Sequence, residues 1–141
     1  MGPPHELLIR VRYSETDQMG VVHHASYLEY LEEGRTALMR DLGFPYEEVE
    51  QRGLCMAVRK IEVRYRQAAR YGDQVVVRTQ VEHFRGASIR YAYELVRAAD
   101  QELLATASAE VACLALKAGF RPTPLPEDIR TALERHRDAR G

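Results

Sequence analysis

The sequence predicts an α+β fold in which an antiparallel five-stranded sheet packs on one long helix. Apolar and polar residues alternate in five segments, which is the pattern of strands with one buried face. A single long segment instead has helical periodicity, and short turn sequences separate the later strands closely enough for antiparallel hairpins. One substantial helix covers only one face of such a sheet, so we expect a second copy of the chain to bury the remainder.

The chain opens with a strand and a polar loop. Residues 7–14 alternate, with Ile9, Val11 and Tyr13 on one side and two arginines between them, which predicts a half-buried strand. The next six residues are polar and end at Gly20, a composition typical of a loop. This loop therefore joins the first strand to the long helix.

The long helix is predicted over residues 26–42. Tyr27 and Leu38 belong to an apolar series at helical spacing, with charged residues mostly between its members. A glycine and then a proline follow the series, and this combination ends helices. A short second helix is expected over residues 45–52.

The rest of the chain returns to strands. The four remaining strands are expected at residues 61–66, 75–83, 89–95 and 103–116. Turn signals separate them, so we expect each strand to pair with the next as a hairpin. A short polar helix over residues 127–136 follows three prolines.

Composition excludes several classes of protein. The 141 residues suffice for one domain, and 45% of them are hydrophobic, as in globular proteins. The 20 basic and 21 acidic residues nearly cancel, which argues against a protein held on nucleic acid by bulk charge. Neither a long apolar run nor a secretory signal is present, and two cysteines make no disulfide framework. We therefore expect one domain over residues 1–141, cytoplasmic, with no nucleic-acid partner and no membrane span.

The segment from the first strand into the long helix carries a long motif, with its characteristic positions at Asp17, Gly20, Val21, Val22, His23, His24, Tyr27, Glu32 and Arg35. This motif resembles the signature of the hotdog-fold acyl-CoA thioesterases. It is most similar to the 4-hydroxybenzoyl-CoA thioesterase branch, which includes the Tol–Pal-associated short-chain enzymes. The resemblance extends over nearly the whole chain. It implies a hotdog fold, in which the five-stranded sheet wraps around the central helix and a short C-terminal helix follows.

The resemblance implies hydrolysis of a small or medium acyl-CoA thioester to the free acid and coenzyme A. Asp17 would be the catalytic residue, as nucleophile or as general base, and the sequence leaves both roles open. Two alternatives stay open: hydrolysis of an acyl-carrier-protein thioester, and a hotdog subunit that binds acyl thioesters without cleaving them. The identity of the acyl group is not readable from the sequence.

The remaining site residues are also implied by the resemblance. The backbone N–H of His24 would polarise the thioester carbonyl, because first-turn N–H groups of a helix lack internal partners. Gly20, Val22 and Tyr27 would surround it. From a partner subunit, Val58 and Arg59 would line the acyl end, since hotdog sites lie at the dimer interface. The expected assembly is a homodimer that associates further into a homotetramer.

Basic residues on the strands are candidates for binding the coenzyme A phosphates, because the planar donors of arginine suit phosphate. The candidates are Arg59, Lys60, Arg64, Arg66, Arg85 and Arg90. Arg85 with Ser88 is the preferred pair, because the matching hairpin of the family lies along the nucleotide arm, and Lys60 is a third candidate. Without the resemblance, these side chains are simply the solvated face of the strands.

Two further patterns receive no catalytic role. The pair His23-His24 lacks the additional ligands that a zinc site needs, so we expect no metal, and no cofactor apart from the coenzyme A of the substrate. Three glutamates of the long helix are interpreted as its exposed face. Glu15, close to Asp17 in the sequence, is expected to contribute little and to serve as a control for substitutions at Asp17.

Overall fold

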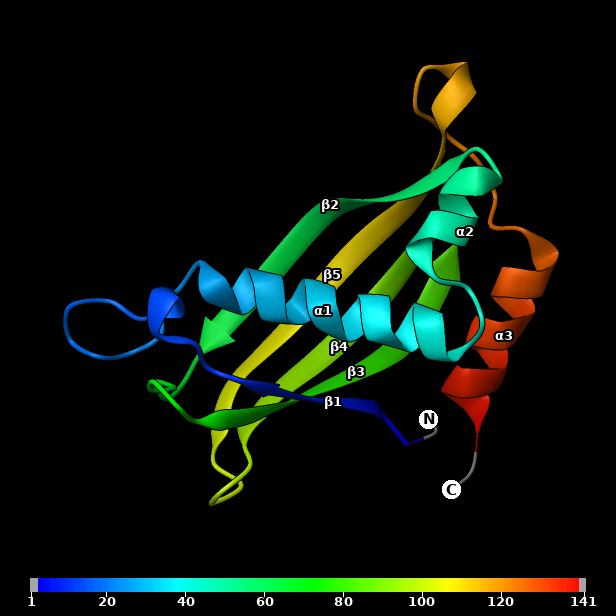
Figure 1. Cartoon of the computed structure of the whole chain (residues 1–141). Coiled ribbons are helices and arrows are strands. Elements are labelled where there is room, and N and C mark those ends of the chain that lie inside the picture. Colours follow the sequence, from blue (N-terminus) through cyan, green and yellow to red (C-terminus); the bar gives the residue numbers. More distant parts are fainter. Residues whose placement is uncertain (1–2, 140–141) are drawn as a thin grey trace.

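The computed structural model describes residues 3–139. Its elements are β1 (His5–Arg10), a 3-10 turn (Tyr13–Glu15), α1 (Ser26–Asp41), α2 (Tyr46–Gln51), β2 (Leu54–Tyr65), β3 (Gln74–Arg85), β4 (Ser88–Arg97), β5 (Leu103–Ala115), a second 3-10 turn (Leu116–Ala118), β6 (Arg121–Pro122) and α3 (Glu127–Asp138). Figure 1 shows α1 lying across one face of the curved sheet, with α3 at the side. This is the helix-and-sheet arrangement that the sequence predicts.

The strand order corrects one expectation about the sheet. The order is β1-β3-β4-β5-β2, with antiparallel neighbours throughout. β2 and β3 follow each other in the chain but do not form a hairpin, because β3 pairs with β1 and β4 while β2 pairs with β5. β2 is therefore an edge strand. The two-residue β6 also pairs with β5, so the sheet has six strands instead of the expected five.

Helices are predicted more accurately than strand ends. The predicted long helix, the short second helix and the short C-terminal helix are confirmed within about two residues. The first strand, however, ends at Arg10, because Val11 N–H donates to Asp73 O at 2.9 Å and the chain then turns. β2 begins at Leu54, well before the predicted start, and a bulge between Val58 and Lys60 interrupts its alternation. Such a bulge hides a strand from a period-two pattern.

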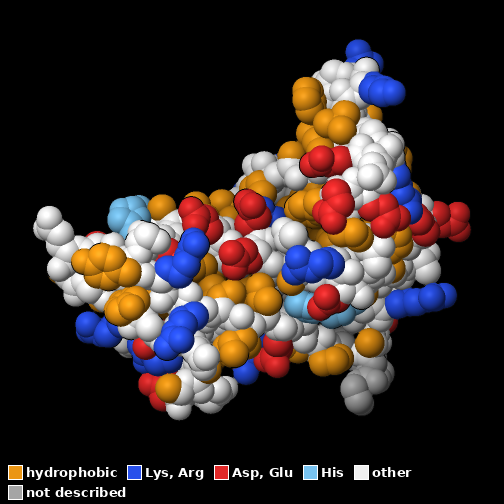
Figure 2. All heavy atoms as spheres, viewed as in Figure 1, with side chains coloured by type: hydrophobic (Ala, Val, Ile, Leu, Met, Phe, Trp, Pro, Cys, Tyr) orange, Lys and Arg blue, Asp and Glu red, His pale blue; other side chains and the backbone are white. Residues whose placement is uncertain are grey.

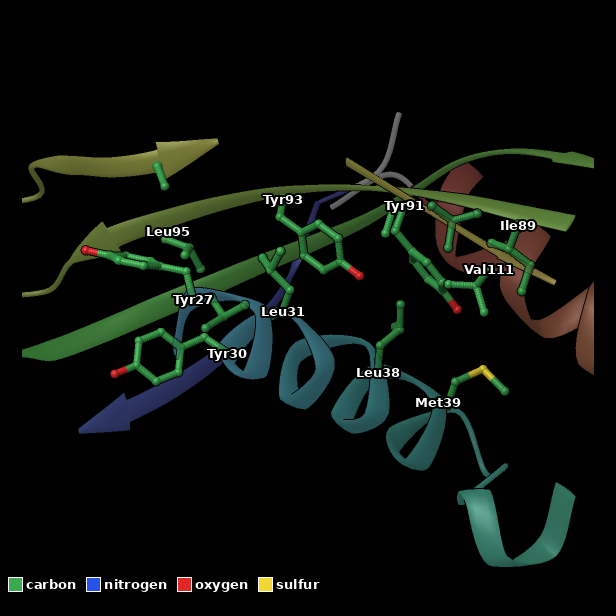
Figure 3. Close-up of a cluster of buried hydrophobic side chains, with 14 of the residues drawn as sticks. Tyr27, Tyr30, Leu31, Leu38, Met39, Ile89, Tyr91, Tyr93, Leu95 and Val111 are labelled. Atoms are coloured by element: carbon green, nitrogen blue, oxygen red, sulfur yellow. The ribbon is translucent and has the colours of Figure 1, made fainter. Parts of the chain in front are cut away.

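The hydrophobic core lies between α1 and the sheet, with side chains of α1 and β4 directed into the same layer (Figure 3). Its largest fully buried members from these two elements are Tyr30, Leu31, Leu38, Met39, Ile89, Tyr91 and Leu95. Gly34 faces β3, and a Cβ at this position would lie 2.7 Å from both Thr79 Oγ1 and Val77 Cγ1. The backbone of α1 can therefore approach β3 closely only because residue 34 is glycine.

The exposed side of α1 is acidic. Glu29, Glu32 and Glu33 are exposed, and Figure 2 shows acidic side chains gathered over this helix. Glu32 lies 3.9 Å from Arg35 Nη2, an ion pair in which the arginine is buried. No helix within residues 3–139 has the length and apolar character needed to cross a membrane.

His136 of α3, which lies near His5 of β1, predicts that folding stability decreases at acidic pH. His5 Nε2 lies 2.7 Å from Asp41 Oδ2, and His136 of α3 lies close enough to His5 for their charges to interact. Burial first, and then His5, lower the pKa of His136 below its ordinary value of 6.5. As the pH falls, His136 therefore binds a proton in the unfolded chain at a higher pH than in the folded chain. The free energy of unfolding consequently decreases below pH 6.5.

We expect the melting temperature to fall as the pH is lowered below 6.5, and His136→Gln to flatten this slope, since the variant carries no titrating ring. Differential scanning fluorimetry across pH 5–8 measures both proteins. Equal slopes for the two proteins would show that His136 does not contribute.

Candidate active site

The loop that carries Asp17 is a closed turn. Asp17 N–H donates to Val21 O at 2.9 Å, and Gly20 N–H donates to Asp17 O at 3.0 Å. Gly20 has a φ of +78°, a conformation that favours glycine. The Asp17 carboxylate uses one oxygen within the turn: Oδ1 accepts Met19 N–H at 2.8 Å and Val21 N–H at 3.4 Å. Within residues 3–139 its other oxygen, Oδ2, has no hydrogen-bond partner and remains free for chemistry.

The chain then enters α1 with one N–H unpaired. His23 N–H donates to Glu15 O, Ala25 N–H to His23 Nδ1, and Ser26 N–H to His23 O. Between them, His24 N–H has no acceptor in the described part of the chain. It lies at the positive end of the α1 dipole, where it can stabilise a developing oxyanion. The His24 ring itself is exposed and stacks on His23 at 4.4 Å between centroids.

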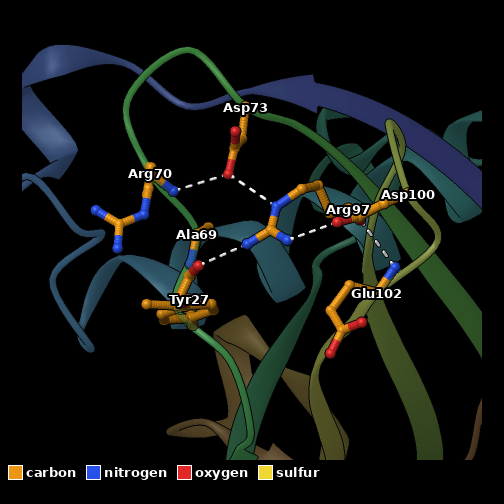
Figure 4. Close-up of polar contacts among 8 residues, drawn as sticks. Tyr27, Ala69, Arg70, Asp73, Arg97, Asp100 and Glu102 are labelled. Carbon is orange, nitrogen blue, oxygen red and sulfur yellow. Dashed lines mark hydrogen bonds and ion pairs between the residues drawn. The ribbon is translucent and has the colours of Figure 1, made fainter.

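The neighbouring loop before β3 holds this region in place. Val22 N–H donates to Ala69 O at 2.8 Å, and Ala69 N–H donates to the Tyr27 hydroxyl at 3.2 Å. Arg97 braces the same loop through Asp73 Oδ2 at 3.1 Å and Ala68 O at 2.9 Å (Figure 4). In the single chain, Val22 and Tyr27 are therefore buried scaffold residues, and a substrate contact for either of them stays a prediction.

A second polar cluster lies on the face of the sheet opposite α1. A hollow of about 350 Å³ is lined by Arg59, His83, Arg85, Ser88, Arg90 and Glu110. Arg59 Nη1 donates to Ser88 Oγ at 2.8 Å, while Arg90 is engaged by Glu82 at 2.7 Å. Within residues 3–139 the Arg85 side chain has no hydrogen bond or ion pair, so it is available to an anion.

The structure thus brings together four of the predicted coenzyme A and acyl residues, but not Lys60: Arg59, Arg85, Ser88 and Arg90 line the hollow. Lys60 Nζ lies 3.3 Å from Glu62 Oε1, and Lys60 does not line the hollow. Val58 is 44% exposed on the β2 edge beside Arg59.

The two parts of the predicted site lie at different positions along β2, one at its C-terminal end and the other near its middle. Tyr65 donates its hydroxyl to His24 O at 3.0 Å, so the Asp17 loop lies beside the end of this strand. Val58 is seven residues earlier, roughly 23 Å away along an extended strand. A single chain therefore does not bring Asp17 and Arg59 together, and the expectation that a partner supplies Val58 and Arg59 stays a prediction.

Sequence reasoning missed that Glu15 is buried and hydrogen-bonded, which makes it unsuitable as a neutral control for Asp17. It is 8% exposed, although the nearby Tyr13 is 77% exposed. Its Oε1 accepts Arg12 N–H at 2.8 Å and the Tyr30 hydroxyl at 2.9 Å. Burial opposes ionisation of Glu15, but these hydrogen bonds outweigh it and hold the pKa of the carboxyl below its ordinary value. The sequence predicts a polar loop at Glu15, and the alternation up to residue 14 carries no signal of the 3-10 turn over Tyr13–Glu15 that directs Glu15 inward.

The comparisons with known proteins identify the family of this chain. The model of the thioesterase-like superfamily matches residues 11–133. The chain belongs to this superfamily. The Bacillus subtilis protein YneP, a putative acyl-CoA thioesterase, is 40% identical over 130 residues, which cover 90% of this chain and 93% of YneP. The acyl-CoA thioesterase YbgC of Haemophilus influenzae is 34% identical over 125 residues, 88% of this chain and 90% of YbgC.

A solved thioesterase from Thermus thermophilus, complexed with coenzyme A and Zn, has a TM-score of 0.82 and 25% identity. The alignment covers 98% of this chain and 97% of that protein. The resemblance to hotdog-fold acyl-CoA thioesterases is therefore confirmed, as is the hotdog fold. Among the described residues, no three His, Cys, Asp or Glu side chains form a group that could hold a metal ion.

Proposed function

We propose that this thioesterase-superfamily protein hydrolyses acyl-CoA thioesters to the free acid and coenzyme A. The observation that carries the proposal is the unpaired N–H of His24 at the start of α1, next to a turn that leaves one oxygen of Asp17 free. Thioester hydrolysis needs both parts: a donor for the developing oxyanion, and a nucleophile or base.

The chemistry follows from these two groups. The thioester oxygen accepts the His24 N–H, so negative charge develops at the positive end of α1. Asp17 Oδ2 then acts in one of two ways. As a base, it takes a proton from a water that attacks the carbonyl carbon. As a nucleophile, it forms a mixed anhydride that water cleaves afterwards. In both routes the carbon–sulfur bond breaks and the thiolate of coenzyme A leaves.

A homodimer would complete the site. The β2 edge has unpaired backbone groups along one side, and Val58 and Tyr65 are exposed on it, 44% and 47% respectively. Antiparallel pairing of two β2 edges would place the Val58 end of one strand against the Tyr65 end of the other. Val58 and Arg59 of one protomer would then lie toward the Asp17 loop of its partner, and the hollow continues from Arg59 across the other face of the sheet. A homotetramer of such dimers stays a prediction.

The hollow suits the phosphate arm of coenzyme A. It brings together the guanidinium groups of Arg59 and Arg85 with the hydroxyl of Ser88. Planar guanidinium donors bind phosphate oxygens in pairs.

We expect Arg85→Ala to raise KM for acyl-CoA about tenfold while kcat changes little. An interaction that contributes equally in the ground state and the transition state affects KM alone. Steady-state kinetics and titration with desulfo-coenzyme A measure the two effects. Lys60→Ala is the control, because its side chain pairs with Glu62 outside the hollow. If Arg85→Ala binds desulfo-coenzyme A with unchanged affinity, an arginine other than Arg85 binds the phosphates.

The overall proposal is tested by free-thiol release from a panel of acyl-CoA esters of increasing chain length, with acyl-carrier-protein thioesters alongside. Turnover of acyl-CoA supports the proposal. If only the carrier-protein thioesters are hydrolysed, the substrate is an acyl-carrier-protein thioester and not acyl-CoA. Tight binding of acyl-CoA without turnover would indicate a binding subunit instead of an enzyme.

A further inference from the structure

We propose that Glu15 and Tyr30 form a buried positioning pair that sets the geometry between Asp17 and the N–H of His24. The inference rests on the proposed function, because it concerns how that site is held. Neither residue touches the substrate. They act through the two segments that carry the site.

The backbone of Glu15 holds His23, the residue that precedes the free N–H. Its carbonyl accepts His23 N–H at 2.8 Å, and the His23 carbonyl accepts Ser26 N–H at 2.9 Å. The carbonyl of the peptide unit between His23 and His24 is therefore fixed by Ser26, on the side of the helix. In a planar trans peptide the N–H points opposite to the carbonyl, so His24 N–H is directed away from the helix.

The side chain of Glu15 joins the same region to α1. Its Oε1 accepts the Tyr30 hydroxyl at 2.9 Å, and its Oε2 accepts the Arg12 guanidinium at 3.1 and 3.2 Å. Tyr30 is 2% exposed in the second turn of α1 and cannot move without disturbing the core. Asp17 follows Glu15 by two residues and His24 follows His23 by one. Both groups of the proposed site are thus placed by one anchored residue.

The pair requires a carboxylate. Every partner of the Glu15 side chain is a donor, and a carboxylate is an acceptor only. A glutamine would turn its amide N–H₂ toward an Arg12 donor at either position, the backbone N–H beside Oε1 or the guanidinium beside Oε2, so one contact would set a donor against a donor. Burial and then Glu15 raise the pKa of the Tyr30 hydroxyl, which keeps it a donor at all physiological pH values.

Tyr30→Phe is the main test, with Glu15→Gln as the second variant should the first fold poorly. We expect kcat to fall 10- to 100-fold with KM within about twofold, because a misplacement of about 1 Å costs on the order of 100-fold in rate. The double variant should lose no more than about the larger single loss, since both changes break one contact. Tyr91→Phe is the matched control: it removes the hydroxyl of a buried tyrosine on β4, outside this network.

A role in folding alone would lower the melting temperature of Tyr30→Phe and leave kcat of the folded protein within twofold of the original. That result would overturn the inference. Asp17→Asn is assayed in parallel: full activity there would overturn the proposed function, whatever Tyr30→Phe does. Amide hydrogen exchange over residues 16–26 needs no turnover. We expect it to accelerate about tenfold in Tyr30→Phe and not in Tyr91→Phe, and equal rates would also overturn the inference.

Discussion

Asp17→Asn is expected to lower kcat by roughly 10²–10⁴, the range for losing a positioned acid–base group or nucleophile. The variant should keep its fold and its affinity for substrate. Asparagine retains an oxygen at the Oδ1 position, so it can still accept the N–H groups of Met19 and Val21 that close the turn. What disappears is the negative charge on Oδ2. Free-thiol release at saturating acyl-CoA and the melting temperature are the two measurements.

The control for this substitution has to come from elsewhere than Glu15, because Glu15 is buried and hydrogen-bonded. Glu33→Gln is suitable, since it also neutralises one carboxylate but lies on the exposed side of α1. It should leave kcat within about twofold of the unmodified protein. Full activity with asparagine at position 17 would end the proposed mechanism and direct attention to the glutamates of α1.

Val58→Asp is expected to convert the proposed dimer to a monomer and to abolish most of the activity. The substitution places a charge at an exposed apolar position of the β2 edge, and charges on an edge oppose strand pairing. Light scattering at micromolar concentration should give the mass of one chain, with kcat/KM falling at least tenfold. A monomer with full activity would show that each chain holds a complete site.

Mixed dimers test the shared site directly. Asp17→Asn is combined with a variant carrying both Arg59→Ala and Arg85→Ala, and the two are refolded together. Random pairing makes half of the dimers mixed, each with one intact shared site, so roughly a quarter of the original activity should return at low substrate concentration. Sites formed within single chains would give no recovery above the sum of the two separate variants.

Local sequence patterns determined much of this protein. Helical periodicity places α1 over Ser26–Asp41 and the following glycine and proline end it, because each of these effects acts within a few residues. The motif from Asp17 to Arg35 identified the superfamily that the family model confirms. It also directed attention to Asp17 and to the N–H of His24, and this N–H has no acceptor among residues 3–139.

Only the tertiary structure decided which segments lie side by side. Alternation reports which side of a strand is buried, but not which strand is its neighbour, so the pairing of β2 with β5 could not be read from the chain. The bulge between Val58 and Lys60 shifts the register of β2 against β5. Lys60 consequently forms an ion pair with Glu62, while Arg59 donates a hydrogen bond to Ser88. Glu15 is buried for the same reason: its partner Tyr30 lies fifteen residues away, and only the docking of α1 brings the two together.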